Sequence, residues 1–194
     1  MKKEEVMKIV NSWKTKNKIN MYTPYKYFKG LETKELIVKK LEEMNKFRHE
    51  KDISKIKFQT DKSIPKEKRK RSPYHKKFED RFGVSAAASL EAKSKVTGVP
   101  VEILKKVYDK GVAAWKTGHR PGATSTSWGN ARVSSFLTLG CTAFSSDADL
   151  LWKVYKMRKS EKRKKFFSQE ISCPKYKLQK YKSRNNFPTF IIML

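Results

Sequence analysis

The chain has 194 residues, and its 46 Lys and Arg against 19 Asp and Glu give a formal net charge of +27. Only 38% of the residues are hydrophobic and 34% are charged, so we expect a packed core for part of the chain only. No stretch approaches the roughly 20 apolar residues that cross a bilayer, which excludes a membrane-spanning segment. Because so much positive charge repels itself, the expected partner is a polyanion, most commonly nucleic acid.

The positive charge is spread unevenly and divides the chain into three segments. Residues 84–152 carry eight basic and five acidic residues, a net +3, whereas residues 153–194 carry thirteen and two, a net +11. Residues 84–152 also hold six of the eight glycines, which is typical of closely packed helices with short turns. We therefore expect a basic N-terminal region at 1–83, a central helical domain at 84–152, and a basic C-terminal arm at 153–194 with an apolar end.

The N-terminal region is expected to contain one amphipathic helix. The aromatic stretch 21–31 contains a proline and a glycine and is expected to be extended or irregular. Residues 33–48 place four apolar side chains at helical intervals, and Thr33 is a suitable N-cap. Residues 65–77 hold seven basic residues and one acid between prolines, which predicts a Lys/Arg-rich linker or an exposed arm.

The central segment is expected to form short helices that end at glycines. Ser85 can cap a helix that ends at Gly98, and Pro100 suits the first turn of the next helix. Gly111 would end that second helix, and a short helix would follow over residues 112–116. Two helices joined by a glycine-containing turn have the shape of a helix-turn-helix motif, with an ordinary αα-corner as the alternative.

The rest of the central segment is expected to be a loop followed by two helices. The stretch 117–127 contains two glycines and a proline, and Thr126 or Ser127 can cap a helix that ends at Gly140. Ser146 can cap a last helix with two aspartates in its first turn, where the helix dipole favours acids. The predicted fold class is therefore mostly α: a small helical domain with basic, partly irregular N- and C-terminal arms.

Residue types that support catalysis or metal binding are sparse. Cys141 and Cys173 are too few for a disulfide framework, and reduced thiols in an intracellular protein are expected. Three histidines and two distant cysteines give no zinc spacing, and no phosphate-cradling glycine motif occurs. Only the residue types suggest that His119 could form an acid–base pair with Asp147 or Asp149. We expect no catalytic residues, no metal and no cofactor, and a small nucleic-acid-processing enzyme is the third alternative.

The basic runs at 65–77 and 153–165 are the candidate nucleic-acid-binding segments. Each Lys or Arg that neutralises a phosphate releases a counterion and adds to salt-dependent affinity. The expected partner is nucleic acid, with DNA favoured over RNA. The candidate residues are Lys66, Lys68, Arg69, Lys70, Arg71, Lys76, Lys77, Lys156, Arg158, Lys159, Lys162, Arg163, Lys164 and Lys165.

Aromatic residues are interleaved with lysines in two places, residues 22–29 and residues 175–182. Stacking on unpaired bases uses this mixture of residue types. The alternative, which we favour, is aromatic packing with lysine stems lying over the rings.

A further candidate site lies in the stretch 114–135, where glycines, a proline, a histidine, two arginines and two tryptophans occur around one loop. Arg120, Arg132 and the N–H groups of the following helix can bind a phosphate, with His119 and Trp128 beside them. The alternative is structural, with Trp128 packed in the interior and Arg132 bonded to loop carbonyls.

The same stretch carries a resemblance to known proteins. Residues 118–140, GHRPGATSTSWGNARVSSFLTLG, contain an Arg-Pro, Thr, Ser-Trp-Gly-x-Ala-Arg pattern that an aspartate follows. This pattern resembles one in an uncharacterised family of small basic proteins of large eukaryotic DNA viruses (phycodnavirus- and mimivirus-like) and marine phages. The matching residues are Arg120, Pro121, Thr124, Ser127, Trp128, Gly129, Ala131, Arg132 and Asp147. The resemblance implies a viral source, but it implies no activity and no catalytic residues.

The resemblance and the charge together lead to a functional expectation. A small basic protein of such a virus is expected in the virion, and in the host cytoplasm or nucleus during infection. Its basic arms would bind nucleic acid without sequence specificity. The alternative is a minor capsid or scaffold protein whose arms thread between capsid subunits, with capsid proteins as partners.

Overall fold

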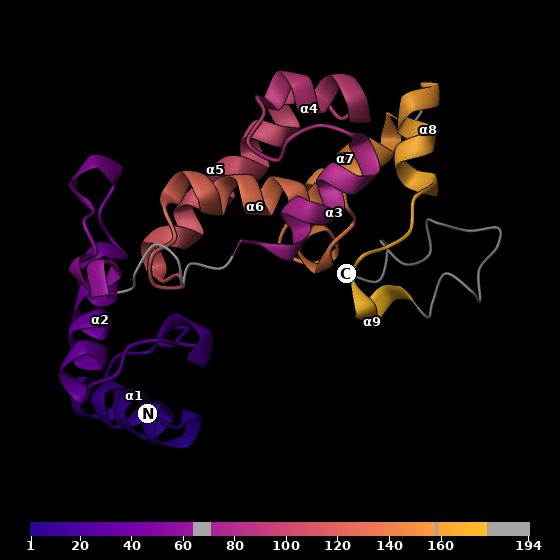
Figure 1. Ribbon diagram of the computed structural model, residues 1–194. Helices are drawn as coiled ribbons and strands as arrows, with labels where there is room; N and C mark the ends of the chain where they lie inside the picture. Colours follow the sequence, from indigo (N-terminus) through magenta and orange to yellow (C-terminus); the bar gives the residue numbers. More distant parts are fainter. Residues whose placement is uncertain (64–70, 158, 178–194) are drawn as a thin grey trace. The chain divides into compact units, whose positions relative to one another are not determined.

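The computed structural model describes residues 1–63, 71–157 and 159–177, which form helices joined by turns and longer irregular segments (Figure 1). These residues contain no strand, which confirms the predicted mostly α class. None of their helices is both long and apolar enough to cross a membrane. In chain order the elements are α1 (Lys3–Asn17), η1 (Tyr25–Tyr27), α2 (Lys34–Phe47), η2 (Ile53–Lys55), η3 (Gln59–Ser63), α3 (Pro73–Phe82), α4 (Leu90–Thr97), α5 (Val101–Thr117), α6 (Ser125–Leu137), η5 (Cys141–Phe144), α7 (Ala148–Lys156), α8 (Glu161–Ser168) and α9 (Pro174–Lys177).

The chain forms two compact units, each made from two stretches of sequence. Unit 1 comprises residues 1–70 and 112–127, and unit 2 comprises residues 71–111 and 128–194. Helices α5 and α6 each contribute residues to both units. This division differs from the three segments expected from charge, because packing groups residues that are far apart in sequence. Trp115, for example, packs on aromatic side chains of unit 1.

Unit 1 is built on the predicted amphipathic helix, which is α2. The hydroxyl of Thr33 accepts a hydrogen bond from the N–H of Leu36 at 3.3 Å, so the predicted N-cap is confirmed. The four apolar positions of the predicted helix are buried, as their spacing requires. Helix α1 buries Val6 and Val10 and packs against α2. Helix α1 is not among the predicted elements.

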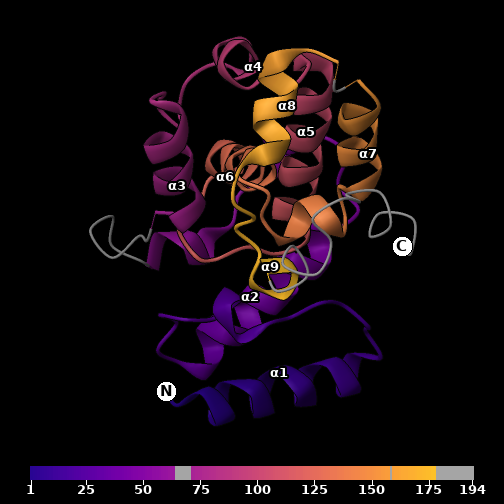
Figure 2. The same ribbon diagram turned by 90° about the vertical axis from the view of Figure 1, so that its right-hand side faces the viewer.

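Unit 2 contains α3, α4, α7 and α8, grouped around the parts of α5 and α6 that belong to it (Figure 2). Its core takes apolar side chains from α3, α5, α6, α7 and α8. Phe78, Leu104, Phe136, Leu151 and Phe166 are essentially inaccessible to solvent. Lysine-rich α8 therefore contributes to a core even though sequence analysis placed it in a basic arm.

The start of α4 differs from the prediction. The helix begins at Leu90 rather than after Ser85, and Ser89 is the residue whose hydroxyl caps it. Ser85 instead accepts a hydrogen bond from the N–H of Ala87 in a preceding turn. The predicted end at Gly98 is confirmed, since this residue has the left-handed conformation (φ 74°) that favours glycine.

The predicted stop at Gly111 is wrong, because α5 continues through it to Thr117. The glycine is needed for a neighbouring helix instead. A Cβ at position 111 would lie 2.9 Å from the Cα of Gly129 and 3.1 Å from the Cβ of Arg132, both on α6. Gly129 is close to the ring of Tyr108 in turn. The two glycines therefore allow α5 and α6 to approach closely, and no separate helix forms over residues 112–116.

The two basic runs are partly helical. Residues 64–70 of the predicted linker lie outside the described part of the chain, but α3 begins at Pro73 with Ser72 as its N-cap. The second run contains the end of α7 and most of α8, whose N-cap is Ser160. The apolar end that was expected over residues 187–194 lies outside the described residues.

The expectation of reduced thiols is wrong, since Cys141 and Cys173 form a disulfide. The chain returns after α8 so that the N–H groups of Ser172 and Cys173 donate to the carbonyl oxygen of Leu139, at 3.1 and 3.2 Å. This backbone contact brings together two cysteines that are 32 residues apart in sequence, a distance at which spacing alone predicts nothing. Closing a loop of this length stabilises a fold by about 3–4 kcal/mol.

Candidate functional site

The interior of unit 1 contains a cluster of three ionisable side chains, which we call the Lys–Asp–His cluster. The Nζ of Lys40 donates to Oδ1 of Asp61 at 3.0 Å and lies 3.3 Å from Nε2 of His119. The same Nε2 lies 2.8 Å from Oδ2 of Asp61. The side chains of Lys40 and His119 have no solvent exposure, and that of Asp61 is 19% exposed. Asp61 thus links α2 to the loop after α5.

Aromatic rings enclose the cluster. The Nζ of Lys40 lies 4.1 Å from the centroid of the Phe58 ring, a cation–π contact. Trp115 stacks on the imidazole of His119 with centroids 4.7 Å apart, and Phe58 meets the same imidazole edge-on at 4.5 Å. These rings shield Lys40 and His119 from water, so the charge of Lys40 is balanced by the carboxylate of Asp61 rather than by solvent.

Burial and pairing act in opposite directions on the pKa values of the cluster. Burial lowers the pKa of Lys40 although Asp61 opposes it, and burial likewise lowers the pKa of His119. Burial alone would raise the pKa of Asp61, but the hydrogen bonds and charges of His119 and Lys40 lower it overall. The Nδ1 of His119 faces the carbonyl oxygen of Trp115 at 2.9 Å. Nδ1 thus faces an oxygen acceptor, whereas Nε2 lies between the carboxylate of Asp61 and the ammonium of Lys40, whose charge opposes protonation of the ring.

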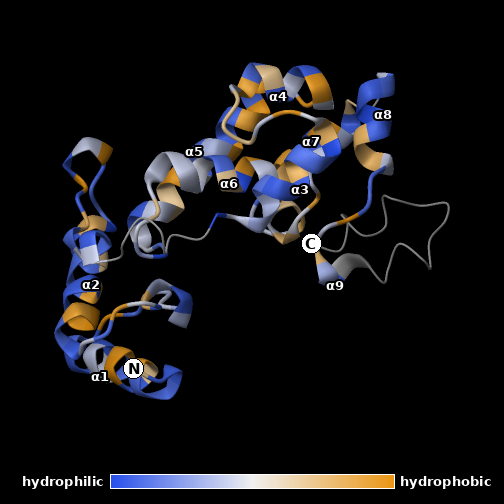
Figure 3. Ribbon diagram, viewed as in Figure 1, coloured by the Kyte–Doolittle hydropathy of each residue, from blue (hydrophilic) through white to orange (hydrophobic). Residues whose placement is uncertain are grey.

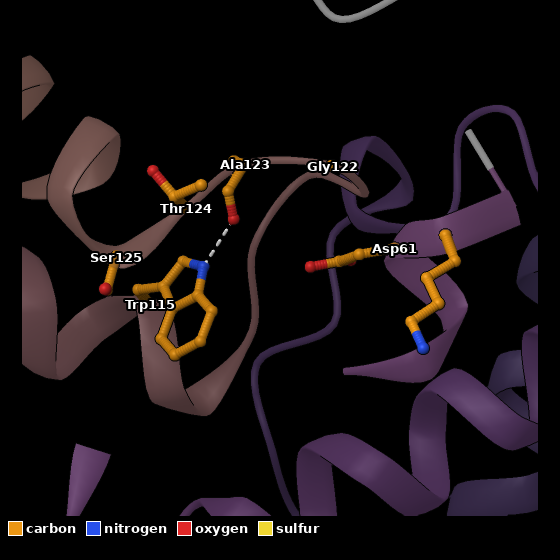
Figure 4. A pocket seen from close by; sticks show the side chains of 7 residues that line it. Asp61, Trp115, Gly122, Ala123, Thr124 and Ser125 are labelled. Carbon is orange, nitrogen blue, oxygen red and sulfur yellow. Dashed lines mark hydrogen bonds between the residues drawn. The ribbon is translucent and has the colours of Figure 1, made fainter. Parts of the chain in front are cut away.

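An open pocket of about 290 Å³ borders the cluster. In Figure 4 the carboxylate of Asp61 points toward the loop that carries Gly122 and Ala123. The indole N–H of Trp115 donates to the carbonyl oxygen of Ala123 at 2.6 Å, which holds this loop in place. The oxygens of Asp61 are bonded to Lys40 and His119, so the carboxylate holds the start of this loop through His119.

In unit 2 the predicted phosphate ligand Arg132 is engaged by a buried carboxylate. Its Nε and one terminal nitrogen donate to the two oxygens of Asp147 at 3.0 and 2.8 Å, and that terminal nitrogen also donates to the hydroxyl of Ser146 at 2.7 Å. Lys110 lies 3.7 Å from Asp147 and 3.0 Å from Asp149. This bidentate pair has the geometry of a strong structural ion pair.

The suggested acid–base pairing of His119 with Asp147 or Asp149 is therefore wrong. The carboxylate at His119 is Asp61, while Asp147 is bonded to Arg132. Residue types alone suggested the pairing, and aspartates at any distance along the sequence fit such an argument equally well.

The four residues of the suggested phosphate site are divided between the two units. His119 is buried and Arg120 exposed in unit 1, whereas Trp128 is half-buried and Arg132 is ion-paired in unit 2. Two of the four are already engaged within the protein: His119 belongs to the Lys–Asp–His cluster, and Arg132 pairs with Asp147. Phosphate binding by Arg120 stays a prediction.

A second buried lysine lies in unit 2. Lys93 has no solvent exposure, and its Nζ donates to the amide oxygen of Asn130 at 2.9 Å. It forms no ion pair with any residue that the structure describes. Burial accordingly lowers the pKa of Lys93 to about 8. This lysine occupies an inward position of α4, where an apolar residue is usual.

The candidate nucleic-acid-binding residues fall into three groups. Lys66, Lys68, Arg69, Lys70 and Arg158 lie outside the described residues. Four others are engaged within unit 2. Two of them form ion pairs, Arg71 with Glu79 and Lys164 with Glu161. The other two donate hydrogen bonds to backbone carbonyls, Lys162 to that of Lys95 and Arg163 to those of Gly98 and Met157. Arg163 is half-buried, so it closes the ends of α4 and α7 rather than facing solvent.

The third group consists of exposed lysines, which we call the unpaired lysines. These are Lys76, Lys77, Lys156, Lys159 and Lys165. None of them has an acidic partner within ion-pair distance in the described part of the chain. Two are near aromatic rings, with Nζ of Lys156 5.2 Å from the Trp152 centroid and Nζ of Lys77 5.8 Å from that of Tyr74. Figure 3 shows α8 as hydrophilic over most of its length.

The sequence patterns do not single out Lys40 and Asp61, the central members of the Lys–Asp–His cluster. One signal was present, because Lys40 lies on the apolar face of α2, between buried positions. A charged residue at such a position requires a buried partner. That partner lies 21 residues further along the chain and could not be identified from the helix pattern.

Comparison with known proteins gives one relationship. Residues 24–153, which are 130 of the 194 residues, match the model of a family of unknown function, DUF5824. No curated protein and no solved structure matches the chain. The matched segment contains both the Lys–Asp–His cluster and the Arg132–Asp147 pair, and it ends before α8. The chain therefore belongs to the DUF5824 family of unknown function.

Proposed function

We propose that the protein binds nucleic acid without sequence specificity through the unpaired lysines of unit 2. The observation that carries this proposal is that these five lysines are exposed and have no acidic partner among the described residues. Lysines that have no acidic partner in the protein can pair with phosphates and release counterions from a nucleic acid.

The surrounding structure supports this assignment. Three of the five, Lys156, Lys159 and Lys165, fall within ten residues that run from the end of α7 into α8. The buried Phe166 and the bonds of Arg163 to two carbonyls hold this segment against the core of unit 2. Charges on a fixed segment lose less freedom on binding than charges on a free chain.

The resemblance to small basic proteins of large DNA viruses extends the proposal. The protein would be packaged in a virion on the genome, with DNA as the main partner. The unpaired lysines read no bases, which suits a protein that coats a genome along its length. Recovery with the shell rather than with the genome of fractionated particles would instead favour the minor capsid or scaffold role.

The test is a salt titration of duplex DNA binding, followed by fluorescence anisotropy. We expect affinity to fall steeply between about 50 and 200 mM salt. The triple variant Lys156→Gln, Lys159→Gln, Lys165→Gln should reduce the slope of log K against log salt by roughly 2 to 3. Salt-independent binding, or no binding near 100 mM salt, would overturn the proposal.

A matched control removes the same charge from cations that already have acidic partners. The variant Lys55→Gln, Arg71→Gln, Lys164→Gln takes three exposed cations that pair with Asp52, Glu79 and Glu161. We expect the slope to change little in this control. An equal loss in both variants would mean that total charge, rather than the unpaired lysines, determines binding.

A further inference from the structure

A different surface, in unit 1, combines exposed aromatic and basic groups. Tyr22 is 72% exposed and meets the ring of Tyr27 edge-on, with centroids 6.1 Å apart. The Nζ of Lys26 lies 5.6 Å from the centroid of the same Tyr27 ring. We call Tyr22, Lys26, Tyr27 and Arg120 the aromatic–basic patch.

The loop after α5 brings Arg120 to this patch from more than ninety residues away in sequence. Gly118 has a positive φ of 146°, and a Cβ at this position would lie 2.9 Å from two ring atoms of Tyr27. The backbone two residues before Arg120 therefore rests directly on the Tyr27 ring. Burial is the main cause that raises the pKa of Tyr27 to about 12, and the charge of Arg120 acts against it.

The basic side chains of the patch are not neutralised within the protein. Neither Lys26 nor Arg120 forms an ion pair with any residue that the structure describes, and neighbouring Lys29 is also exposed without an acidic partner there. Burial and the like charge of Arg120 together lower the pKa of Lys26. Lys26 and Arg120 repel each other and have no acidic partner in the described part of the chain, so they are suited to an anionic ligand.

We propose that the aromatic–basic patch binds single-stranded nucleic acid, with an unpaired base stacked on Tyr22 and adjacent phosphates bound by Lys26 and Arg120. This inference rests on the proposed function for the class of partner, but it assigns a separate site and a separate form of nucleic acid. Every base has a face that can stack, so the site accepts any sequence. A duplex keeps its bases stacked internally and cannot use Tyr22 in this way.

The exposed ring gives the first test. Binding of labelled oligo(dT) and oligo(rU) is measured by anisotropy with Tyr22→Ala, Tyr22→Phe and the control Ile53→Ala. Ile53 is another exposed apolar residue of unit 1, at 41% exposure. We expect about tenfold weaker binding for Tyr22→Ala and little change for Tyr22→Phe or Ile53→Ala. Because Tyr22 lies at the surface, the variant should fold, which circular dichroism verifies.

The charges give the second test. Lys26→Gln and Arg120→Gln should each lower the salt slope of single-strand binding by about 0.7, whereas the control Lys16→Gln, an exposed lysine of α1, should not. Ultraviolet crosslinking of the bound oligonucleotide, followed by peptide mapping, should label the peptide that contains Tyr22.

The outcomes separate this inference from the proposed function. A Tyr22→Ala protein that binds single strands within twofold of the unsubstituted protein would overturn the stacking site, as would crosslinks confined to unit 2. Steep salt dependence on duplex DNA would then still support the unpaired lysines. Conversely, single-strand binding that is lost in Tyr22→Ala, together with absent duplex binding, would overturn the proposed function and support the patch. A preference for one oligonucleotide would decide between DNA and RNA.

Discussion

The two units carry almost the same charge but bury charge in different ways. Unit 1 has 23 basic and 10 acidic residues, a net +13, and unit 2 has 23 and 9, a net +14. Unit 1 gathers its buried ionisable groups into one cluster of Lys40, Asp61 and His119. Unit 2 keeps such groups apart: Arg132 pairs with the buried Asp147, and Lys93 donates to the side-chain amide of Asn130. Unit 2 also contains the disulfide.

The comparison shows that net charge does not determine how a unit is held together. In unit 1 a single carboxylate neutralises the cluster, so its stability depends strongly on Asp61. In unit 2 the disulfide, the Arg132–Asp147 ion pair and the apolar core each stabilise a different part of the fold. The excess charge of both units is left at the surface, where it is available to an anionic partner.

The largest expected effect is in unit 1. Asp61→Leu leaves Lys40 buried without a carboxylate and should lower the free energy of unfolding by about 3–5 kcal/mol. Denaturant unfolding measures the loss, and hydrogen exchange should place it in unit 1. The control Asp80→Leu removes an exposed aspartate and should change stability by about 0.5 kcal/mol or less. Similar losses in both variants would contradict the dependence of unit 1 on the cluster.

Reduction of the disulfide should act on unit 2 alone. Dithiothreitol should lower the free energy of unfolding by about 3–4 kcal/mol, because the unfolded chain regains the freedom that the loop had removed. Hydrogen exchange should increase near Cys141 and Cys173 and stay unchanged in α1 and α2. The double variant Cys141→Ala, Cys173→Ala serves as the control, since the reductant should not affect it. Equal loosening of both units would show that the disulfide does not stabilise unit 2 separately.

The buried lysine of unit 2 should make stability depend on pH. Lys93 has a folded-state pKa of about 8 against an ordinary value of 10.5, so between these pH values the unfolded chain binds more protons. The free energy of unfolding should therefore rise with pH across this window, by up to about 3 kcal/mol. In Lys93→Met this contribution should be absent. The same pH dependence in both proteins, measured by denaturant unfolding, would exclude Lys93 as its source.

The smallest effect concerns the contact between α5 and α6. Gly111→Ala should lower the free energy of unfolding by about 1–2 kcal/mol, because the added Cβ meets the backbone of Gly129. Helix propensity alone would make the same change stabilising by about 1 kcal/mol. Ala113→Gly, at an exposed position of α5, measures the propensity term separately. A more stable Gly111→Ala protein would show that the two helices do not need this glycine.

Local features of the fold could be predicted, and features that depend on distant partners could not. The spacing in α2, its cap at Thr33 and the end of α4 at Gly98 all follow from residues within one or two turns. Because glycine usually ends a helix, the sequence predicts a helix end at Gly111. Its actual role depends on Gly129, which lies on another helix.

The candidate sites show the same limit. The basic runs indicated where positive charge is concentrated, but they could not separate Arg163, which is bonded to two carbonyls, from Lys165, which is exposed. The partners of Arg163 include a carbonyl 65 residues away, at Gly98. Only packing determines which cations of a run are used inside the protein.

The sequence by itself determined a helical protein with an excess of 27 positive charges, because helix periodicity, capping and charge depend on composition and on near neighbours. Only the tertiary structure decided how the charges are used. It placed His119 on Asp61 across 58 residues, joined Cys141 to Cys173, and brought Gly118 onto the ring of Tyr27. The physical reason is that ion pairs, disulfides and ring contacts act over a few ångströms in space, and the path of the chain, rather than sequence spacing, sets those distances.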